Sequence, residues 1–139
     1  MATSPSAEPA MELSSARHGD AVVVSPRGRI DHAGAEGFKT ALAPYLARCL
    51  PGHPLVLDLD GVDYIASVGL RVLMLASRQI RTQGGTILVA ALQPLVREIF
   101  EISKFTLVFR CFPSVADALA DPAARPQPGA AADEPAGRA

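Results

Sequence analysis

A single hydroxyl group, that of Ser67, lies where the sequence changes from a strand-like pattern to a helical one. The apolar run before it stops at Ile65, and a helical pattern opens with Leu70 after Gly69. The first N–H groups of a helix lack internal partners and carry partial positive charge, so a phosphate on Ser67 would be stabilised there. Serine is also a common helix N-cap with no further role. The residues alone favour the cap and leave a phosphorylation switch as the alternative.

The helix that follows Ser67 has two different sides when it is drawn at about 100° per residue. The expected core side holds Val68, Val72, Leu75, Ala76 and Ile80, with Gly69 and Leu73 near its edge. The opposite side holds Ser67, Leu70, Arg71, Met74, Arg78 and Arg81. The apolar pair Leu70 and Met74, set among arginines, predicts a protein-docking surface.

A rival chemistry is suggested by the two carboxylates of "LVLDLDGV". This segment resembles the nucleophile motif of haloacid-dehalogenase-type phosphatases, which implies that Asp58 attacks phosphate, Asp60 acts as acid and base, and Mg²⁺ offsets the charge. Such enzymes also need a downstream lysine and an acidic pair for Mg²⁺. Only Lys104 follows, no such acidic pair exists, and too little chain remains for that larger fold. Asp58, Asp60 and Asp63 are better interpreted as strand-end and turn residues.

Other catalytic or metal-binding patterns are missing from the sequence. His18, His32 and His53 lack the spacing of metal ligands, and Ser67 lies in no Gly-x-Ser-x-Gly motif. The isolated Cys49 and Cys111 are expected to be reduced, buried thiols. We therefore predict a protein that is not an enzyme and that has no metal or cofactor.

The elements that would position Ser67 alternate between strands and helices. A hairpin is expected from the segments 13–17 and 21–25, followed by a helix over 35–50 that is kinked or broken at Pro44. Strands are then expected at 55–59, 86–90 and 107–109, and helices at 67–82, 94–102 and 114–119, with Ser114 as a cap. This order predicts an α/β fold: a mixed sheet of four or five strands with helices packed against it.

The composition sets the limits of the folded unit and the classes of partner. The chain has 139 residues, 49% of them hydrophobic, and a net charge of −1. The segments 1–11 and 121–139 contain mostly small residues and proline, so we expect disordered tails around a single domain at 12–120. No basic cluster predicts nucleic-acid or anionic-membrane binding, and no apolar run reaches the length of a membrane span. Without a signal-peptide pattern, a cytoplasmic location is expected.

The order of motifs resembles the STAS-domain family of bacterial anti-sigma factor antagonists. The resemblance covers roughly residues 12–120 and is carried by "GRIDHAGAEGFKTAL" and "LVLDLDGVDYIASVGLRVLML". In that family a motif of the type Asp-Ser-Ser/Thr-Gly-Leu carries the phosphorylated serine. By position, Ser67 matches this serine, Gly69 and Leu70 match the Gly-Leu pair, and Asp31 matches an acidic residue near the same surface. The resemblance implies a GHKL-type serine kinase, itself the anti-sigma factor, as partner, and a PP2C-type phosphatase that reverses the modification.

The sequence departs from this family pattern at two positions. Ala66 stands in place of the usual aspartate and Val68 in place of the second serine or threonine, so Ser67 is the sole candidate acceptor in the loop. Partner binding is therefore better supported than phosphorylation. A second hypothesis follows: a STAS domain that is never phosphorylated and serves as a structural subunit of a lipid-transport or sensory complex.

The function expected from the sequence is that of a partner-switching regulator of transcription. The chain should bind its kinase when unphosphorylated and be released when Ser67 is phosphorylated. We expect the free chain to be a monomer. The residues expected at the bound surface are Asp31, His32, Ser67, Gly69, Leu70, Arg71 and Met74.

Overall fold

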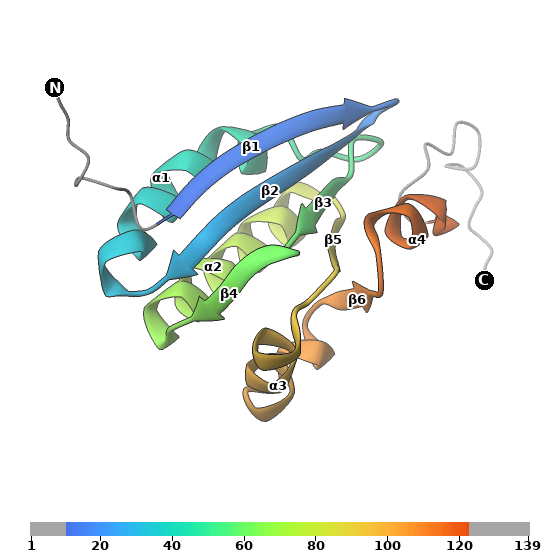
Figure 1. Cartoon of the computed structure of the whole chain (residues 1–139). Coiled ribbons are helices and arrows are strands. Elements are labelled where there is room, and N and C mark those ends of the chain that lie inside the picture. The colour runs from blue at the N-terminus through green and yellow to red at the C-terminus, as the bar shows by residue number, and fades with distance from the viewer. Residues whose placement is uncertain (1–10, 123–139) are drawn as a thin grey trace, which may run out of the picture.

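A computed structural model describes residues 11–122 of the chain as one sheet with helices on both faces (Figure 1). The strands are β1 (Met11–His18), β2 (Ala21–Ile30), β3 (Leu55–Asp58), β4 (Gly61–Ile65), β5 (Ile87–Ala90) and β6 (Arg110–Phe112). The helices are α1 (His32–Ala47), α2 (Ser67–Gln83), α3 (Pro94–Ile102) and α4 (Val115–Ala120), with a 3₁₀ turn, η2 (Phe105–Leu107).

The sheet is mixed, with the strand order β1-β2-β3-β5-β6. β1 runs antiparallel to β2, and the remaining pairs are parallel. The long strand β2 pairs with β3 along its first half and with β4 along its second half, with a register shift between Gly28 and Arg29. The predicted α/β class is confirmed. Within residues 11–122 the sheet has six strands rather than four or five, because the segment before Ser67 pairs with β2 as a strand of its own.

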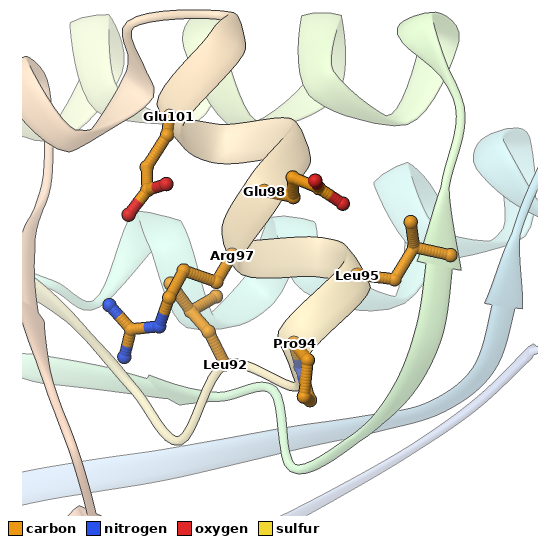
Figure 2. Close-up of a pocket in the computed structure, with 6 residues that line it drawn as sticks. All are labelled: Leu92, Pro94, Leu95, Arg97, Glu98 and Glu101. Carbon is orange, nitrogen blue, oxygen red and sulfur yellow. The ribbon is translucent and has the colours of Figure 1, made fainter.

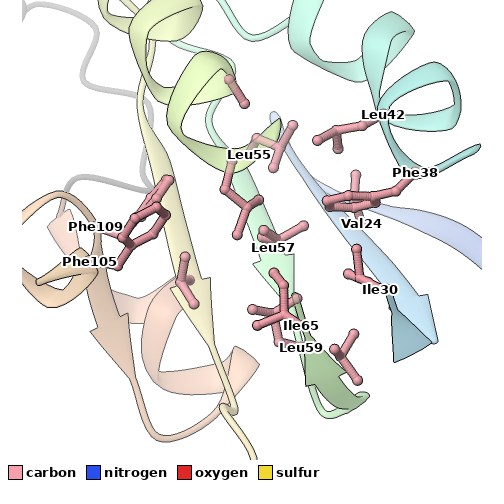
Figure 3. Packing of buried hydrophobic residues seen from close by; sticks show 14 of the residues in the cluster. Val24, Ile30, Phe38, Leu42, Leu55, Leu57, Leu59, Ile65, Phe105 and Phe109 are labelled. Atoms are coloured by element: carbon pink, nitrogen blue, oxygen red, sulfur yellow. The ribbon is translucent and has the colours of Figure 1, made fainter. Parts of the chain in front are cut away.

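Two hydrophobic clusters lie on the two faces of the sheet, as the alternation of side chains along a strand requires. In β3, Leu55 and Leu57 belong to the larger cluster, while Val56 between them belongs to the smaller one. The larger cluster includes side chains from α1, α2 and α3, and Figure 3 shows Phe38 and Leu42 of α1 turned toward the strands. Helix α4 covers the smaller cluster with Ala118. The starts of α1 and α2 are thereby held on one face of the sheet.

The predicted strand at 107–109 is wrong, and the strand β6 lies three residues later. Phe105 and Phe109 are buried four residues apart, and the N–H of Phe109 donates to the carbonyl of Phe105 over 2.9 Å. Their rings lie 5.9 Å apart, next to that of Phe100. An aromatic pair at this spacing buries both rings from a single helical turn, so the apolar run is not a strand.

Helix α1 also differs from the expectation at both ends. It begins at His32, three residues early, because Asp31 caps it. It continues through Pro44 to Ala47, so of the two predicted alternatives, a kink or a break at Pro44, the break is wrong. This proline is exposed in the last turn, and its missing N–H removes one hydrogen bond, to the Thr40 carbonyl, without ending the helix.

The other predicted elements are confirmed with small shifts at their ends, except that β2 runs to Ile30, five residues beyond the predicted strand. α2 ends at Gln83, and its C-cap residue Gly84 has a positive φ of 77°, which suits a residue without a side chain. Ser114 caps α4 by accepting a hydrogen bond from the Asp117 N–H at 3.0 Å. The expected tails lie outside the described residues except at their inner ends: Met11 opens β1, and Asp121 accepts two hydrogen bonds from Arg110.

Candidate functional site

The starts of α1 and α2 lie side by side at one end of the sheet. Parallel strands β2 and β4 end in register, with Ile30 opposite Ile65. The next backbone N–H, that of Ala66, donates to the Ile30 carbonyl at 2.8 Å. Asp31 and Ser67 therefore each follow one residue of a hydrogen-bonded pair. The structure brings these two predicted site residues together because both strands turn into helices at the same edge.

Gly69 allows α2 to begin this close to the end of β2. A Cβ atom at Gly69 would lie 2.6 Å from Ile30 Cγ2, 2.9 Å from Ile65 Cγ1 and 3.2 Å from the Ile30 carbonyl oxygen. Any side chain at this position would push the first turn of α2 away from the sheet. Gly69 is therefore a buried positioning residue and has no surface of its own to offer a partner.

At the start of α1, the side chain of Asp31 is fully engaged. Its Oδ1 accepts a hydrogen bond from the Gly34 N–H at 3.0 Å, and its Oδ2 lies 3.7 Å from Arg29 Nε. The hydrogen bond from Gly34 lowers the pKa of the Asp31 carboxyl, and the Arg29 guanidinium lowers it further, while burial acts in the opposite direction. His32, the first residue of α1, is exposed next to this cap.

Sequence reasoning missed the support behind Asp31. The guanidinium of Arg29 lies over the ring of Tyr64, 4.7 Å from its centroid, and these two residues are register partners on β2 and β4. A cation over an aromatic face is a favourable contact. The sequence signal for this support was Arg29, two residues before Asp31. This spacing places the Arg29 and Asp31 side chains near the same strand end.

At the start of α2, no side chain caps the helix. The N-cap residue is Ala66, which has an extended backbone and a side chain that cannot accept a hydrogen bond. Ser67 is the first helical residue and is exposed, and among the described residues its hydroxyl has no hydrogen-bond partner. The prediction that Ser67 is the cap is wrong, because the extended residue lies one position earlier, where this chain has an alanine. The Ser67 hydroxyl is therefore available for another role.

The outward side of α2 matches the prediction at Ser67 and the arginines, while its core side is rotated. Ser67, Arg71, Arg78 and Arg81 are exposed, and Leu70 and Met74 are half-buried against the core. The buried residues are Gly69, Leu73, Ala76, Ser77 and Ile80. Leu75, expected in the core, is 45% exposed. Ala76 and Ile80 are buried as predicted, whereas Ser77 was not expected in the core, because a polar residue gives no hydrophobic signal.

The carboxylate pair of the rival phosphatase hypothesis has a structural role at Asp58. One oxygen of Asp58 accepts a hydrogen bond from Ser25 Oγ and the other from the Asp60 N–H, both at 3.1 Å. These contacts hold the turn between β3 and β4, as the turn interpretation predicts. Across residues 11–122 no group of three or more acidic, histidine or cysteine side chains is arranged to hold a metal ion.

The two thiols lie apart from the helix starts, and both are free. Cys49 is buried and donates to the Thr86 carbonyl at 3.1 Å, whereas Cys111 is only partly buried. Burial raises the pKa of both thiols, which favours the uncharged and less reactive form.

Two pockets of the molecule lie elsewhere. One of about 590 Å³ surrounds α3, where Arg97 and Glu101 project to one side and Leu95 and Glu98 to the other (Figure 2). Another of about 560 Å³ lies beside Tyr45, near the hairpin turn and the end of α1. Neither of these two pockets contains a predicted site residue, and the predicted site residues lie at the two helix starts. No helix among residues 11–122 is long and apolar enough to cross a membrane.

Comparison with known proteins identifies the family of the chain. The family model for the STAS domain matches residues 12–118. A Bordetella bronchiseptica protein named as an anti-sigma factor antagonist, BtrV, is 40% identical over 83 residues, which are 60% of this chain and 70% of that protein.

Solved structures have the same fold. An anti-sigma factor antagonist from Mycobacterium paratuberculosis has a TM-score of 0.71 at 28% identity, covering 78% of this chain and 91% of the other. The anti-sigma factor antagonist SpoIIAA in its unphosphorylated form has a TM-score of 0.63 at 15% identity, covering 78% and 93%. The Bacillus SpoIIAA in its phosphorylated form has a TM-score of 0.58 at 14% identity, covering 78% and 96%. The chain, with its mixed sheet and two adjoining helix starts, belongs to the STAS-domain family, among relatives that are anti-sigma factor antagonists.

Proposed function

We propose that the protein is an anti-sigma factor antagonist that binds an anti-sigma serine kinase of the GHKL type and is released when Ser67 is phosphorylated. The observation that carries the proposal is the state of Ser67. Its hydroxyl is exposed at the first position of α2 and has no hydrogen-bond partner among the described residues. A kinase therefore reaches it without breaking a contact of the fold.

The position of Ser67 also suits the phosphorylated product. The N–H groups of the first helical turn have no internal partners, and neither α1 nor α2 has an acidic residue in its first turn. A phosphate is stabilised at such an end. The fold thus accepts the modification, whereas a partner covering Leu70 and Met74 must desolvate a group with a charge near −2. Phosphorylation then changes binding while it leaves the fold intact.

The remaining site residues have supporting roles in this proposal. Leu70, Arg71 and Met74 contact the partner, His32 contributes from the neighbouring helix start, and Asp31 fixes that start in place. The chain itself catalyses nothing, and a PP2C-type phosphatase restores the unmodified serine. The SpoIIAA relative, solved in unphosphorylated and phosphorylated forms, supports this cycle.

Ala66 favours a second candidate function. The position where the family has an aspartate is the N-cap of α2, and here its side chain can neither accept a hydrogen bond nor assist a kinase. A STAS domain that docks constitutively, as a structural subunit of a larger complex, would need no aspartate there.

The test is site-localised mass spectrometry of the protein recovered from its own cells, in growth and in stress, with Ser67→Ala as the control. Phosphate on Ser67 is the expected result. The anti-sigma factor is then identified by cross-linking, produced separately and tested for binding. Ser67→Ala should bind it at least as well as the unmodified chain, and Ser67→Asp should bind it much more weakly. Equal binding by the two variants, with no phosphate in either condition, would establish the structural subunit instead.

A further inference from the structure

A single stripe of side chains runs along the exposed side of α2 from its first turn to its last. It consists of Ser67, Arg71, Met74, Arg78 and Arg81, which are separated by four, three, four and three residues. This spacing keeps side chains on one helix face. At 1.5 Å per residue the stripe is about 21 Å long. It begins at the proposed phosphorylation site, so whatever lies along it also meets Ser67.

The opposite side of α2 is fixed against α1, which leaves the stripe facing outward. Gln83, on the far side of the helix, donates hydrogen bonds to the carbonyls of Leu46 and Cys49 at the end of α1, at 2.9 and 3.0 Å. Ser67, Arg71, Arg78 and Arg81 are all exposed, and Met74 is half-buried. We call these five residues the α2 stripe.

The α2 stripe is positively charged and uncompensated. Helix α2 contains no aspartate or glutamate, and the ion pairs formed among residues 11–122 join Arg29 to Asp31 and Arg110 to Asp121. The arginines of the stripe therefore have no carboxylate partner in the described part of the chain. The exposed surfaces of α1 and α3, in contrast, carry both signs of charge. The chain as a whole has a net charge of −1, so the positive field is local to this helix.

The stripe also has an apolar contact in its middle. Met74 lies within it and Leu70 beside it, both half-buried against the core. Arginines around a small apolar contact match a protein surface whose acidic groups surround an apolar anchor. A nucleic-acid backbone would use the charges and leave Leu70 and Met74 without a counterpart.

We propose that the α2 stripe docks an acidic surface of the anti-sigma factor, and that a phosphate on Ser67 competes with this surface for Arg71. The proposal rests on the proposed function and names the chemistry of its partner. Ser67 and Arg71 are four residues apart on one face, so a phosphate on the first is within reach of the guanidinium of the second. Phosphorylation thus acts twice: it occupies one arginine of the stripe and it repels the acidic surface.

The first experiment measures association of the purified anti-sigma factor with the chain over a series of salt concentrations. The double variant Arg71→Gln/Arg78→Gln should slow association roughly tenfold or more at low salt and flatten the salt dependence. The matched control is Arg17→Gln/Arg48→Gln, which removes the same charge from exposed arginines at the opposite end of β2 and α1. This control should bind like the unaltered chain.

The outcomes separate the two proposals. If the unaltered chain does not bind the anti-sigma factor, both the proposed function and this inference fail. If it binds but the stripe variant and the control behave alike, only the inference fails. A third outcome is that a double-stranded DNA probe binds in a way that depends on Arg71 and Arg78, while binding of the anti-sigma factor does not depend on them. That outcome would assign the stripe to nucleic acid and overturn the inference.

The second experiment tests the competition without any partner. Phosphoserine is placed at position 67 genetically, and the phosphate is titrated by ³¹P NMR in the otherwise unaltered chain and with Arg71→Gln. A guanidinium that binds the phosphate lowers its second pKa, by roughly 0.3 pH unit for one helix-surface pair. Arg81→Gln, which lies far along the stripe, should leave the titration unchanged. Identical curves with and without Arg71 would contradict the competition.

Discussion

The starts of α1 and α2 are neighbours in space with opposite chemistry. At α1, Asp31 caps the helix and is itself held by Gly34 and Arg29. At α2, the cap position is Ala66, and the exposed Ser67 hydroxyl is unpaired among the described residues. Both helices begin from in-register strands, so sheet geometry does not account for the difference. The cap at the start of α1 contributes to stability, whereas the polar groups at the start of α2 remain available for a partner or a phosphate.

The largest effect should come from breaking the close approach that makes the two starts neighbours. Gly69→Ala places a Cβ 2.6 Å from Ile30 Cγ2, and we expect it to lower the free energy of unfolding by about 1–3 kcal/mol. It should also weaken binding of the anti-sigma factor, because the first turn of α2 must shift.

Gly37→Ala is the matched control for Gly69→Ala. Gly37 lies inside α1, and a Cβ there would meet nothing within 4 Å. Replacing an unstrained helical glycine should raise the free energy of unfolding by about 0.5–1 kcal/mol. Urea denaturation measures both variants, and opposite signs of the two changes in unfolding free energy support the contact argument. Destabilisation by both would show that α1 and α2 tolerate no added side chain at all.

Removing the cap of α1 should have the next largest effect. Asp31→Ala leaves the Gly34 N–H without its side-chain acceptor and Arg29 without its ion pair, so the thermal midpoint should fall by a few degrees. Calorimetry measures the midpoint. Asp31→Asn, which keeps a cap of similar quality, should lose less. A midpoint unchanged by Asp31→Ala would mean that the cap of α1 is not a source of stability.

Low pH should remove part of the difference in stability between the starts of α1 and α2. Because folding lowers the pKa of Asp31 below its ordinary value of 3.8, the carboxylate contributes stability that is fully present above that value. This contribution is lost as the pH falls through the lower, folded-state pKa. The difference in unfolding free energy between the unaltered chain and Asp31→Asn should therefore shrink on acidification from neutral pH. A difference that stays constant down to strongly acidic pH would show that the charge of Asp31 plays no part.

Supplying the missing cap should make α2 resemble α1. Ala66 already has the extended backbone of an N-cap, with φ of −88° and ψ of 170°, so Ala66→Asp should add about 1 kcal/mol to the free energy of unfolding. Ala66→Asn, which caps without charge, separates the hydrogen bond from the electrostatic effect. If neither variant gains stability in urea denaturation, water already forms the hydrogen bonds that the free N–H groups at the start of α2 need.

Sequence patterns identified the order of elements because turn and cap residues mark the ends of most of them. Gly84 and Ser114 lie where their chemistry predicts. Patterns failed where tertiary packing selects small or unexpected residues. The buried face of α2 includes the polar Ser77, which no hydrophobic pattern marks, whereas the apolar Leu75 that was expected in the core is exposed.

The site was predictable to a similar extent. The pairing of Ile30 with Ile65, which brings Asp31 beside Ser67, depends on strand register and cannot be derived from spacing along the chain. The exposed side of α2 was derived correctly because its arginines repeat at helical intervals. The cap was placed one residue too late because the family position that caps this helix holds an alanine here, and an alanine gives no sequence signal.

The smallest effect on stability should come from Ser67→Ala. The hydroxyl has no hydrogen-bond partner among residues 11–122 and is exposed, so its removal should change the free energy of unfolding by less than about 0.5 kcal/mol. Urea denaturation of Ser67→Ala beside Asp31→Ala measures the contrast directly. A loss at Ser67 as large as that at Asp31 would mean that the serine is a structural cap after all, and the two helix starts would then be alike. An unchanged stability, together with a changed response to the kinase, would confine the role of Ser67 to function, because a residue that contributes nothing to folding is free to be modified without unfolding the chain.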